Sequence, residues 1–147
     1  MTVEKPNLNK RRVTRTYAMQ ALYQWHFTQE SSELLLRDFI SDYGLPAQEV
    51  DVEYFKKILL GALTHCESLD QVIAKKCNRK LSLLNPVELA VLRLATFELI
   101  YCPEVPYAVV MNEAIELAKK FGAVEGYKYV NGVLSALAPE LRPNEMT

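Results

Sequence analysis

The stretch NPVELAVLRLATFELIY, residues 85–101, carries the strongest local helix signal in the chain. Asn85 is a good N-cap, Pro86 suits the first helical position, and Glu88 stands where its side chain can reach back to the cap. From residue 89 onward the stretch is apolar on nearly every side, with three polar exceptions: Arg93, Thr96 and Glu98. A helix of that composition must be surrounded by other elements. We therefore expect residues 85–101 to form the central helix of the core.

Toward the N-terminus, apolar side chains recur at spacings of three and four, which predicts further helices that each bury one face. The expected boundaries are a start near Asn9, a cap at Ser31 or Ser32 with an end at Gly44 and Pro46, and a cap at Asp51. The helix after Asp51 is expected to kink or restart where Ser68 and Gln71 have capping-box spacing, and to run to about Cys77.

Toward the C-terminus, one helix is expected to end at Gly122 in a left-handed conformation. Gly126 opens a short connection to the last helix, whose apolar face continues to Pro139. The chain is thus predicted to be all-α, with about seven helices and no strand. We expect residues 1–8 to be a flexible N-terminal arm and residues 9–147 to be one helical domain.

Composition favours an ordinary globular protein of the cytoplasm. The chain has 147 residues, of which 50% are hydrophobic, and this is near the usual size of one domain. Its three cysteines form no CxxC pair, which argues against a disulfide framework and for a reducing compartment. No apolar run approaches the ~20 residues needed to span a bilayer. We expect neither export nor membrane insertion.

Positive charge is concentrated at the start of a chain whose net charge is only −1. Residues 1–15 carry one carboxylate, Glu4, against five cations: Lys5, Lys10, Arg11, Arg12 and Arg15. Helical spacing places the three arginines on one side, and their forked donors match phosphate oxygens. Cations at a helix N-terminus oppose its dipole, which suggests a use elsewhere. The pattern predicts a cationic patch that binds a polyanion; the alternative is a solvated helix start.

A second candidate surface lies in the segment FGAVEGYKYVNG, residues 121–132. Aromatic rings that stack on splayed bases, with cations and amides beside them, commonly hold single-stranded RNA. The segment supplies these side-chain types: Phe121, Tyr127, Lys128, Tyr129 and Asn131. An aromatic stripe at helical spacing is more often part of a core, so both interpretations stand at this point.

The sequence contains no pattern typical of catalysis. Its five glycines form neither a P-loop nor a dinucleotide-binding fingerprint, and its two histidines lack metal-binding spacing. His65 and Cys66 are neighbours on a helix, so their side chains should point about 100° apart, which is poor geometry for a nucleophile and its base. Glu113 and Glu116 are expected to be solvated helix charges. We predict no enzyme, no catalytic residue, no metal and no cofactor.

Three segments together resemble the NusB family of transcription antitermination proteins, and the resemblance covers almost the whole chain. They are KRRVTRTYAMQALYQW at residues 10–25, NPVELAVLRLATFEL at 85–99 and VPYAVVMNEAIELAKKFGAVEGYKYVNGVL at 105–134. The third is the most specific. The resemblance implies an all-helical fold of two packed helical subdomains. It also implies a non-enzymatic protein that binds boxA RNA together with NusE, a small-subunit ribosomal protein, and helps to assemble the antitermination complex on RNA polymerase, most prominently in ribosomal RNA transcription.

The resemblance also implies roles for individual residues. The RNA-binding positions would be Lys10, Arg11, Arg12, Arg15, Gln20, Phe121, Lys128 and Tyr129. Tyr23 and Glu88 match positions at the family's NusE interface, although Tyr23 could equally be a packing residue.

Two departures and two alternatives remain. Val13 stands where some relatives extend the arginine run, so the patch is expected either to be weaker or to recruit Lys10 instead. Glu125 adds a negative charge to the RNA-side loop and is expected to weaken RNA binding. A related helical domain also serves as an accessory module fused to RNA cytosine methyltransferases, and a protein-binding scaffold is a further alternative. Some relatives self-associate, and the sequence leaves a homodimer of this chain undecided.

Overall fold

A computed structural model describes residues 8–42, 44–46 and 48–146 of the chain, and these residues form seven α-helices and no strand. The helices are α1 (Leu8–Thr28), α2 (Ser32–Arg37), α3 (Val52–Thr64), α4 (Cys66–Ala74), α5 (Pro86–Tyr101), α6 (Tyr107–Phe121) and α7 (Gly126–Leu141). A π-helical turn, Asp38–Asp42, extends α2. The predicted flexible arm, residues 1–8, falls outside the described residues except for Leu8, where α1 begins.

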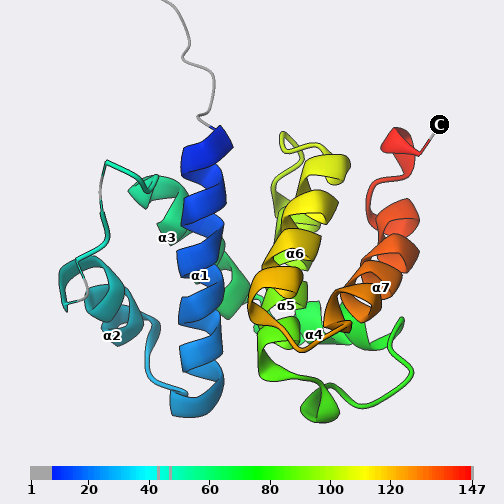
Figure 1. Ribbon diagram of the computed structural model, residues 1–147, viewed down its shortest axis with the longest axis horizontal. Helices are drawn as coiled ribbons and strands as arrows, with labels where there is room; N and C mark the ends of the chain where they lie inside the picture. The colour runs from blue at the N-terminus through cyan, green and yellow to red at the C-terminus, as the bar shows by residue number, and fades with distance from the viewer. Residues whose placement is uncertain (1–7, 43, 47, 147) are drawn as a thin grey trace, which may run out of the picture.

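The helices form two packed groups that share α5 (Figure 1). In one group α1 packs on α3, and α2 covers α3; in the other, α6 and α7 pack on each other and on α5, and α4 also packs on α5. Because α5 contacts both groups, every residue from Glu88 to Leu99 is buried. The predicted central helix and the all-helical fold are therefore confirmed.

Both ends of α5 are fixed by side chains. Asn85 caps the first turn, where its Oδ1 accepts hydrogen bonds from the backbone N–H of Val87 at 2.9 Å and of Glu88 at 3.4 Å. The expected return bond from Glu88 to the cap is replaced, because its carboxylate accepts instead from the backbone N–H of Ala123 at 3.1 Å. At the other end, the buried Arg142 donates to main-chain carbonyl oxygens in the last turn of α5.

The boundaries on either side of α3 differ in how well the sequence predicts them. Asp51 caps α3 as expected, and its Oδ1 accepts from the backbone N–H of Tyr54 at 3.0 Å. The break after α3 falls at His65 and not at Ser68, whose hydroxyl donates to the His65 carbonyl oxygen. Helix α4 then ends at Ala74, three residues before the expected end.

The turn between α6 and α7 corrects the expectation for Gly122. This glycine has a φ of −84°, and the left-handed residue of the turn is Glu125, with a φ of 69°. Gly122 is required for a different reason: a Cβ there would lie 2.7 Å from the Ala118 carbonyl oxygen. Helix α7 also continues through Pro139 to Leu141.

Candidate nucleic-acid interface

The three arginines at the start of α1 point to three different helices. Arg11 reaches Asp51 at the start of α3, Arg12 reaches Glu113 on α6, and Arg15 reaches Glu98 on α5. Each guanidinium is paired with a carboxylate, so the charges that oppose the helix dipole are offset by acidic groups from other helices. The expectation of one shared cationic patch is therefore corrected: the arginines spread apart and join α1 to its neighbours.

Arg15 belongs to the core. Its Nε lies 2.8 Å from Glu98 Oε1 and its Nη2 lies 3.0 Å from Glu98 Oε2, while the hydroxyl of Tyr54 donates to Oε2 at 2.5 Å. Arg15 is 4% exposed and Glu98 is 1% exposed. Burial together with the neighbouring Glu98 carboxylate raises the pKa of Tyr54, so the hydroxyl keeps its proton and remains a donor. This geometry makes Arg15 a structural link between α1, α3 and α5.

Arg11 and Lys10 lie at the edge of the α1–α3 contact. The Arg11 guanidinium carbon sits 3.6 Å from the centroid of the Tyr54 ring, and its Nε is 3.4 Å from Asp51 Oδ2. Lys10 is half-buried, and its carbonyl oxygen accepts the hydroxyl of Thr14 at 2.7 Å. Arg11 thus retains partial access to solvent on the α3 side of α1.

Arg12 opens onto a groove between α1 and α6. Its side chain is 58% exposed although its Nε lies 3.0 Å from Glu113 Oε2. The groove has a volume of about 440 Å³, and its lining residues are Arg12, Thr16, Glu113, Glu116, Leu117, Lys119 and Lys120. Lys119 and Lys120 are exposed cations to which the sequence analysis gave no role in binding. The available signal was helical spacing. Lys120 follows Glu113 by seven residues and Lys119 follows Glu116 by three, so each lysine lies beside one carboxylate of the groove.

Aromatic rings continue the groove into the α6–α7 turn. The ammonium of Lys119 lies 4.9 Å from the Tyr127 ring centroid, and that of Lys120 lies 5.3 Å from the Phe121 ring centroid. Phe121 and Tyr127 are half-buried and packed against the core, so each presents part of its ring to solvent. The turn therefore combines the two residue types that hold single-stranded RNA.

The remaining predicted positions of this turn have partners of their own. Lys128 is exposed and forms an ion pair with Glu125. The ring of Tyr129 is half-buried, and the guanidinium of Arg79 lies over it at 4.5 Å from the centroid. Arg79 therefore covers a face of the Tyr129 ring that a base would need for stacking.

Gln20 and Tyr23 lie on a different part of α1 from the arginines. They line a mainly apolar depression of about 510 Å³ together with Tyr17, Gln24, Phe27, Thr28 and Phe39. Tyr23 is 39% exposed and Phe27 is 61% exposed, with ring centroids 5.1 Å apart in an edge-to-face arrangement. Exposed aromatic pairs of this kind are typical of protein-binding surfaces. Phe27 was missed in the sequence interpretation.

Glu88 is buried beneath the α6–α7 turn and is not part of an exposed face. It is 6% exposed, and a Cβ at Gly126 would lie 2.3 Å from its Oε2. Together with its hydrogen bond to the Ala123 N–H, this packing shows that Glu88 fixes the conformation of the turn. Glu88 would therefore affect the predicted NusE contact indirectly, through the α6–α7 turn that it supports.

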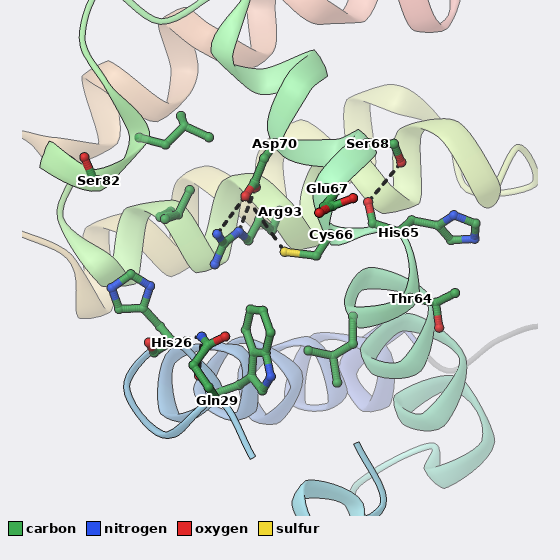
Figure 2. Close-up of a pocket in the computed structure, with 14 residues that line it drawn as sticks. His26, Gln29, Thr64, His65, Cys66, Glu67, Ser68, Asp70, Ser82 and Arg93 are labelled. Carbon is green, nitrogen blue, oxygen red and sulfur yellow. Dashed lines mark hydrogen bonds and ion pairs between the residues drawn. The ribbon is translucent and has the colours of Figure 1, made fainter. Parts of the chain in front are cut away.

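A further pocket, of about 840 Å³, contains none of the predicted binding residues (Figure 2). It lies between the end of α1, the α3–α4 junction and α5, where Arg93 forms two hydrogen bonds of 2.9 Å with Asp70. Figure 2 shows Cys66 directed toward this pair and the ring of His65 directed away from it. Burial raises the pKa of the Cys66 thiol, so it stays protonated. The adjacent residues are thus not arranged as a nucleophile and its base.

The described part of the chain lacks two features, a metal-binding cluster and a membrane-spanning helix. Within it, no three histidine, cysteine, aspartate or glutamate side chains come together as a metal site would require. Among the same residues, no helix has both the length and the apolar composition needed to cross a membrane.

Comparisons with known proteins agree on one family. The NusB family model matches residues 12–139. Transcription antitermination protein NusB of Coxiella burnetii (strain Dugway 5J108-111) is 46% identical over 136 residues, which are 92% of this chain and 97% of the relative. The protein of the same name from Legionella pneumophila (strain Corby) is 41% identical over 145 residues, or 99% of this chain and 97% of the relative.

Solved structures give the same result. The structure of T. maritima NusB superposes with a TM-score of 0.81 at 30% sequence identity and covers 97% of both chains. A crystal structure of antitermination factors NusB and NusE in complex with double-stranded RNA matches with a TM-score of 0.80 at 30% identity, over 89% of this chain and 97% of that one.

The fold and these matches define a class of all-helical, RNA-binding regulators of transcription that are not enzymes. Within that class, the chain belongs to the NusB family.

Proposed function

We propose that this chain is a transcription antitermination factor that binds boxA RNA together with NusE. The observation that carries the proposal is the groove between α1 and α6, where the exposed Arg12, Lys119 and Lys120 lead into the aromatic α6–α7 turn. A single RNA strand in the groove would place its phosphates against these cations. Its bases would lie against the exposed edges of Phe121 and Tyr127.

The charges of the groove favour joint binding with a partner. Three cations line it, but two carboxylates, Glu113 and Glu116, lie among them. Phosphate contacts contribute to RNA binding mainly through charge. Because the two carboxylates repel phosphate, the groove alone should attract RNA only modestly. A partner that supplies further contacts to the same RNA would make the complex tighter than either protein alone.

The partner site is proposed to be the apolar depression farther along α1. Arg12, Thr16, Gln20, Tyr23 and Phe27 follow one another at spacings of four, four, three and four, so they share one face of the helix. RNA at the start of this face and NusE at its end would therefore be neighbours. In this arrangement Tyr23 contacts NusE, and Gln20, which the sequence analysis assigned to RNA, lies with it in the NusE depression. Arg15 acts by holding α1 in place.

The wider role follows from the same proposal. The complex of this chain, NusE and boxA RNA would join the antitermination complex on RNA polymerase in the cytoplasm and act in ribosomal RNA transcription. If copies of the chain self-associate, the exposed Tyr23 and Phe27 are the surface that a homodimer would share with NusE.

Fluorescence anisotropy of a labelled boxA RNA, titrated with the protein with and without NusE, tests the proposal. A scrambled RNA of the same composition serves as the control. We expect tighter binding to boxA than to the scrambled RNA, and a further gain when NusE is present. Equal, weak binding to both RNAs that NusE does not change would contradict it.

Glu125 is expected to limit RNA affinity. Its carboxylate pairs with Lys128, a residue of the α6–α7 turn that the sequence predicts to bind RNA. Replacing Glu125 with lysine should tighten boxA binding about threefold, because it frees Lys128 and adds a cation where surface charges are worth up to ~1 kcal/mol. Glutamate and lysine tolerate a left-handed backbone conformation to a similar degree, so the variant should keep the fold.

The matched control for this change is Glu125→Gln, which removes the charge without adding one and should give a smaller gain. Anisotropy at two salt concentrations measures both effects, since the gain should shrink at high salt. An affinity that is the same for all three proteins at low salt would show that Glu125 does not face the RNA.

A further inference from the structure

The segment between α4 and α5 carries a second concentration of positive charge. Residues 75–80 read KKCNRK, with four cations and no carboxylate. The Nζ of Lys76 lies 2.5 Å from Oε1 of Glu140, and this ion pair ties the segment to α7. The other three cations, Lys75, Arg79 and Lys80, are exposed, and none forms an ion pair with a carboxylate among the described residues. We call this segment, residues 75–80, the basic connection.

The basic connection reaches the α6–α7 turn through Arg79. Arg79 covers the ring of Tyr129, and the two residues line a depression of about 510 Å³ with Ala123, Val124 and Glu125 of the turn. The groove between α1 and α6 ends at Lys119 and Lys120, only three residues before Ala123. The two hollows are therefore joined by the short stretch of chain at the end of α6.

The depression also offers apolar surface at its rim. Val124 is 93% exposed and Leu83 is 68% exposed, and both line it. Exposed apolar side chains beside the Arg79 guanidinium match a nucleic acid strand, whose bases are flat and apolar on their faces and whose phosphates are charged. The carboxylates that line the same depression are Glu125, which already pairs with Lys128, and Glu88, which is buried under the turn.

We propose that the basic connection extends the RNA-binding surface, so that a single RNA strand crosses the α6–α7 turn and continues over residues 75–80. A base stacks on the outer face of the Arg79 guanidinium, whose inner face rests on Tyr129, and Lys75 and Lys80 neutralise phosphates on either side. This extension rests on the proposed function, because it begins where the boxA groove ends.

The test compares boxA RNA alone with boxA RNA lengthened by oligouridine at its 5′ end or at its 3′ end. One of the two extensions should bind the unmodified protein more tightly and with a steeper salt dependence. The slope should increase by about 1.4, from about 0.7 for each of the two phosphate contacts of Lys75 and Lys80. Replacing Lys75, Arg79 and Lys80 with glutamine should abolish that gain and leave binding of unextended boxA unchanged within about twofold, since these residues lie outside the groove.

Two further variants make the result specific. Arg37/Lys56/Lys57→Gln removes the same charge from α2 and α3 and should keep the full gain. Arg79→Lys keeps the charge but loses the planar face, so it should retain the salt slope and lose part of the affinity gain. Circular dichroism melting confirms that each variant is folded.

The outcomes separate the two proposals. If the unmodified protein binds none of the RNAs in preference to a scrambled strand, the proposed function fails. If it binds boxA but neither extension adds affinity, or if the gain persists in the Lys75/Arg79/Lys80→Gln variant, only the extension is overturned.

Discussion

Replacing Arg15 with methionine is expected to lower the free energy of unfolding by about 3–5 kcal/mol, the usual result of removing one partner of a buried ion pair. The guanidinium holds Glu98 with two hydrogen bonds of 2.8 and 3.0 Å, and both residues are nearly inaccessible to solvent. Without Arg15, the carboxylate stays buried with only the Tyr54 hydroxyl beside it. Urea denaturation followed by helix circular dichroism measures the loss.

A compensating variant distinguishes this cause from poor packing. Removing all three polar groups together, as Arg15→Met, Glu98→Leu and Tyr54→Phe, should restore most of the stability, because well-packed apolar replacements of buried ion pairs are often neutral or stabilising. Arg37→Ala, at an exposed position of α2, should change stability by less than about 0.5 kcal/mol. An Arg15→Met variant as stable as Arg37→Ala would show that the buried pair is not needed for the fold.

Replacing Arg142 with alanine is expected to destabilise the protein by about 3 kcal/mol, because several buried acceptors lose their donor at once. Its guanidinium donates to the carbonyl oxygens of Leu99 at 2.6 Å, Val105 at 2.9 Å and Cys102 at 3.0 Å, and it also pairs with Glu145. Carbonyl groups in the last turn of a helix have no partner within the helix. Arg142 therefore fastens the C-terminal residues to the end of the central helix.

Arg142→Lys is the informative comparison for this effect. Lysine keeps the charge and most of the volume. Its single ammonium, however, cannot donate at once to the several carbonyl oxygens that the planar guanidinium reaches in different directions. We expect an intermediate loss of stability in urea denaturation. Equal stability of the lysine variant and the unmodified protein would mean that charge, and not the forked hydrogen bonding, is what the site requires.

The helices could be predicted where local chemistry decides them. Asn85 and Pro86 define the start of α5, and Asp51 caps α3, because these side chains act on backbone groups within three residues. The burial of α5 follows from its composition, since a helix that is apolar all round is stable only when other helices cover it.

The boundaries that tertiary contacts decide were predicted less well. Gly122 is a glycine because of the nearby Ala118 carbonyl oxygen, and the left-handed position falls on Glu125, a residue that rarely adopts it. Glu88 has the spacing of a capping box, but Ala123 offers its N–H across the core and takes the carboxylate instead. Neither contact can be read from residues near in sequence.

The binding site was predictable in composition and not in geometry. The arginine cluster was visible, yet its members pair with Asp51, Glu98 and Glu113, which lie between 40 and 101 residues farther along the chain. One signal was available: Glu98 is a carboxylate on the most apolar helix of the chain, and a buried carboxylate requires a cation. That argument would have assigned one arginine to the core, although not which one.

The salt dependence of boxA binding is the most direct measurement of whether the groove between α1 and α6 holds RNA phosphates. With NusE present at a fixed saturating concentration, the dissociation constant is determined over a range of salt for the unmodified protein and for the Arg12/Lys119/Lys120→Gln variant. We expect weaker binding by the variant and a logarithmic salt slope that is smaller by about 2, from about 0.7 for each lost contact. The Arg37/Lys56/Lys57→Gln variant should keep the slope of the unmodified protein. An unchanged slope in the groove variant would contradict the assignment of this groove to RNA.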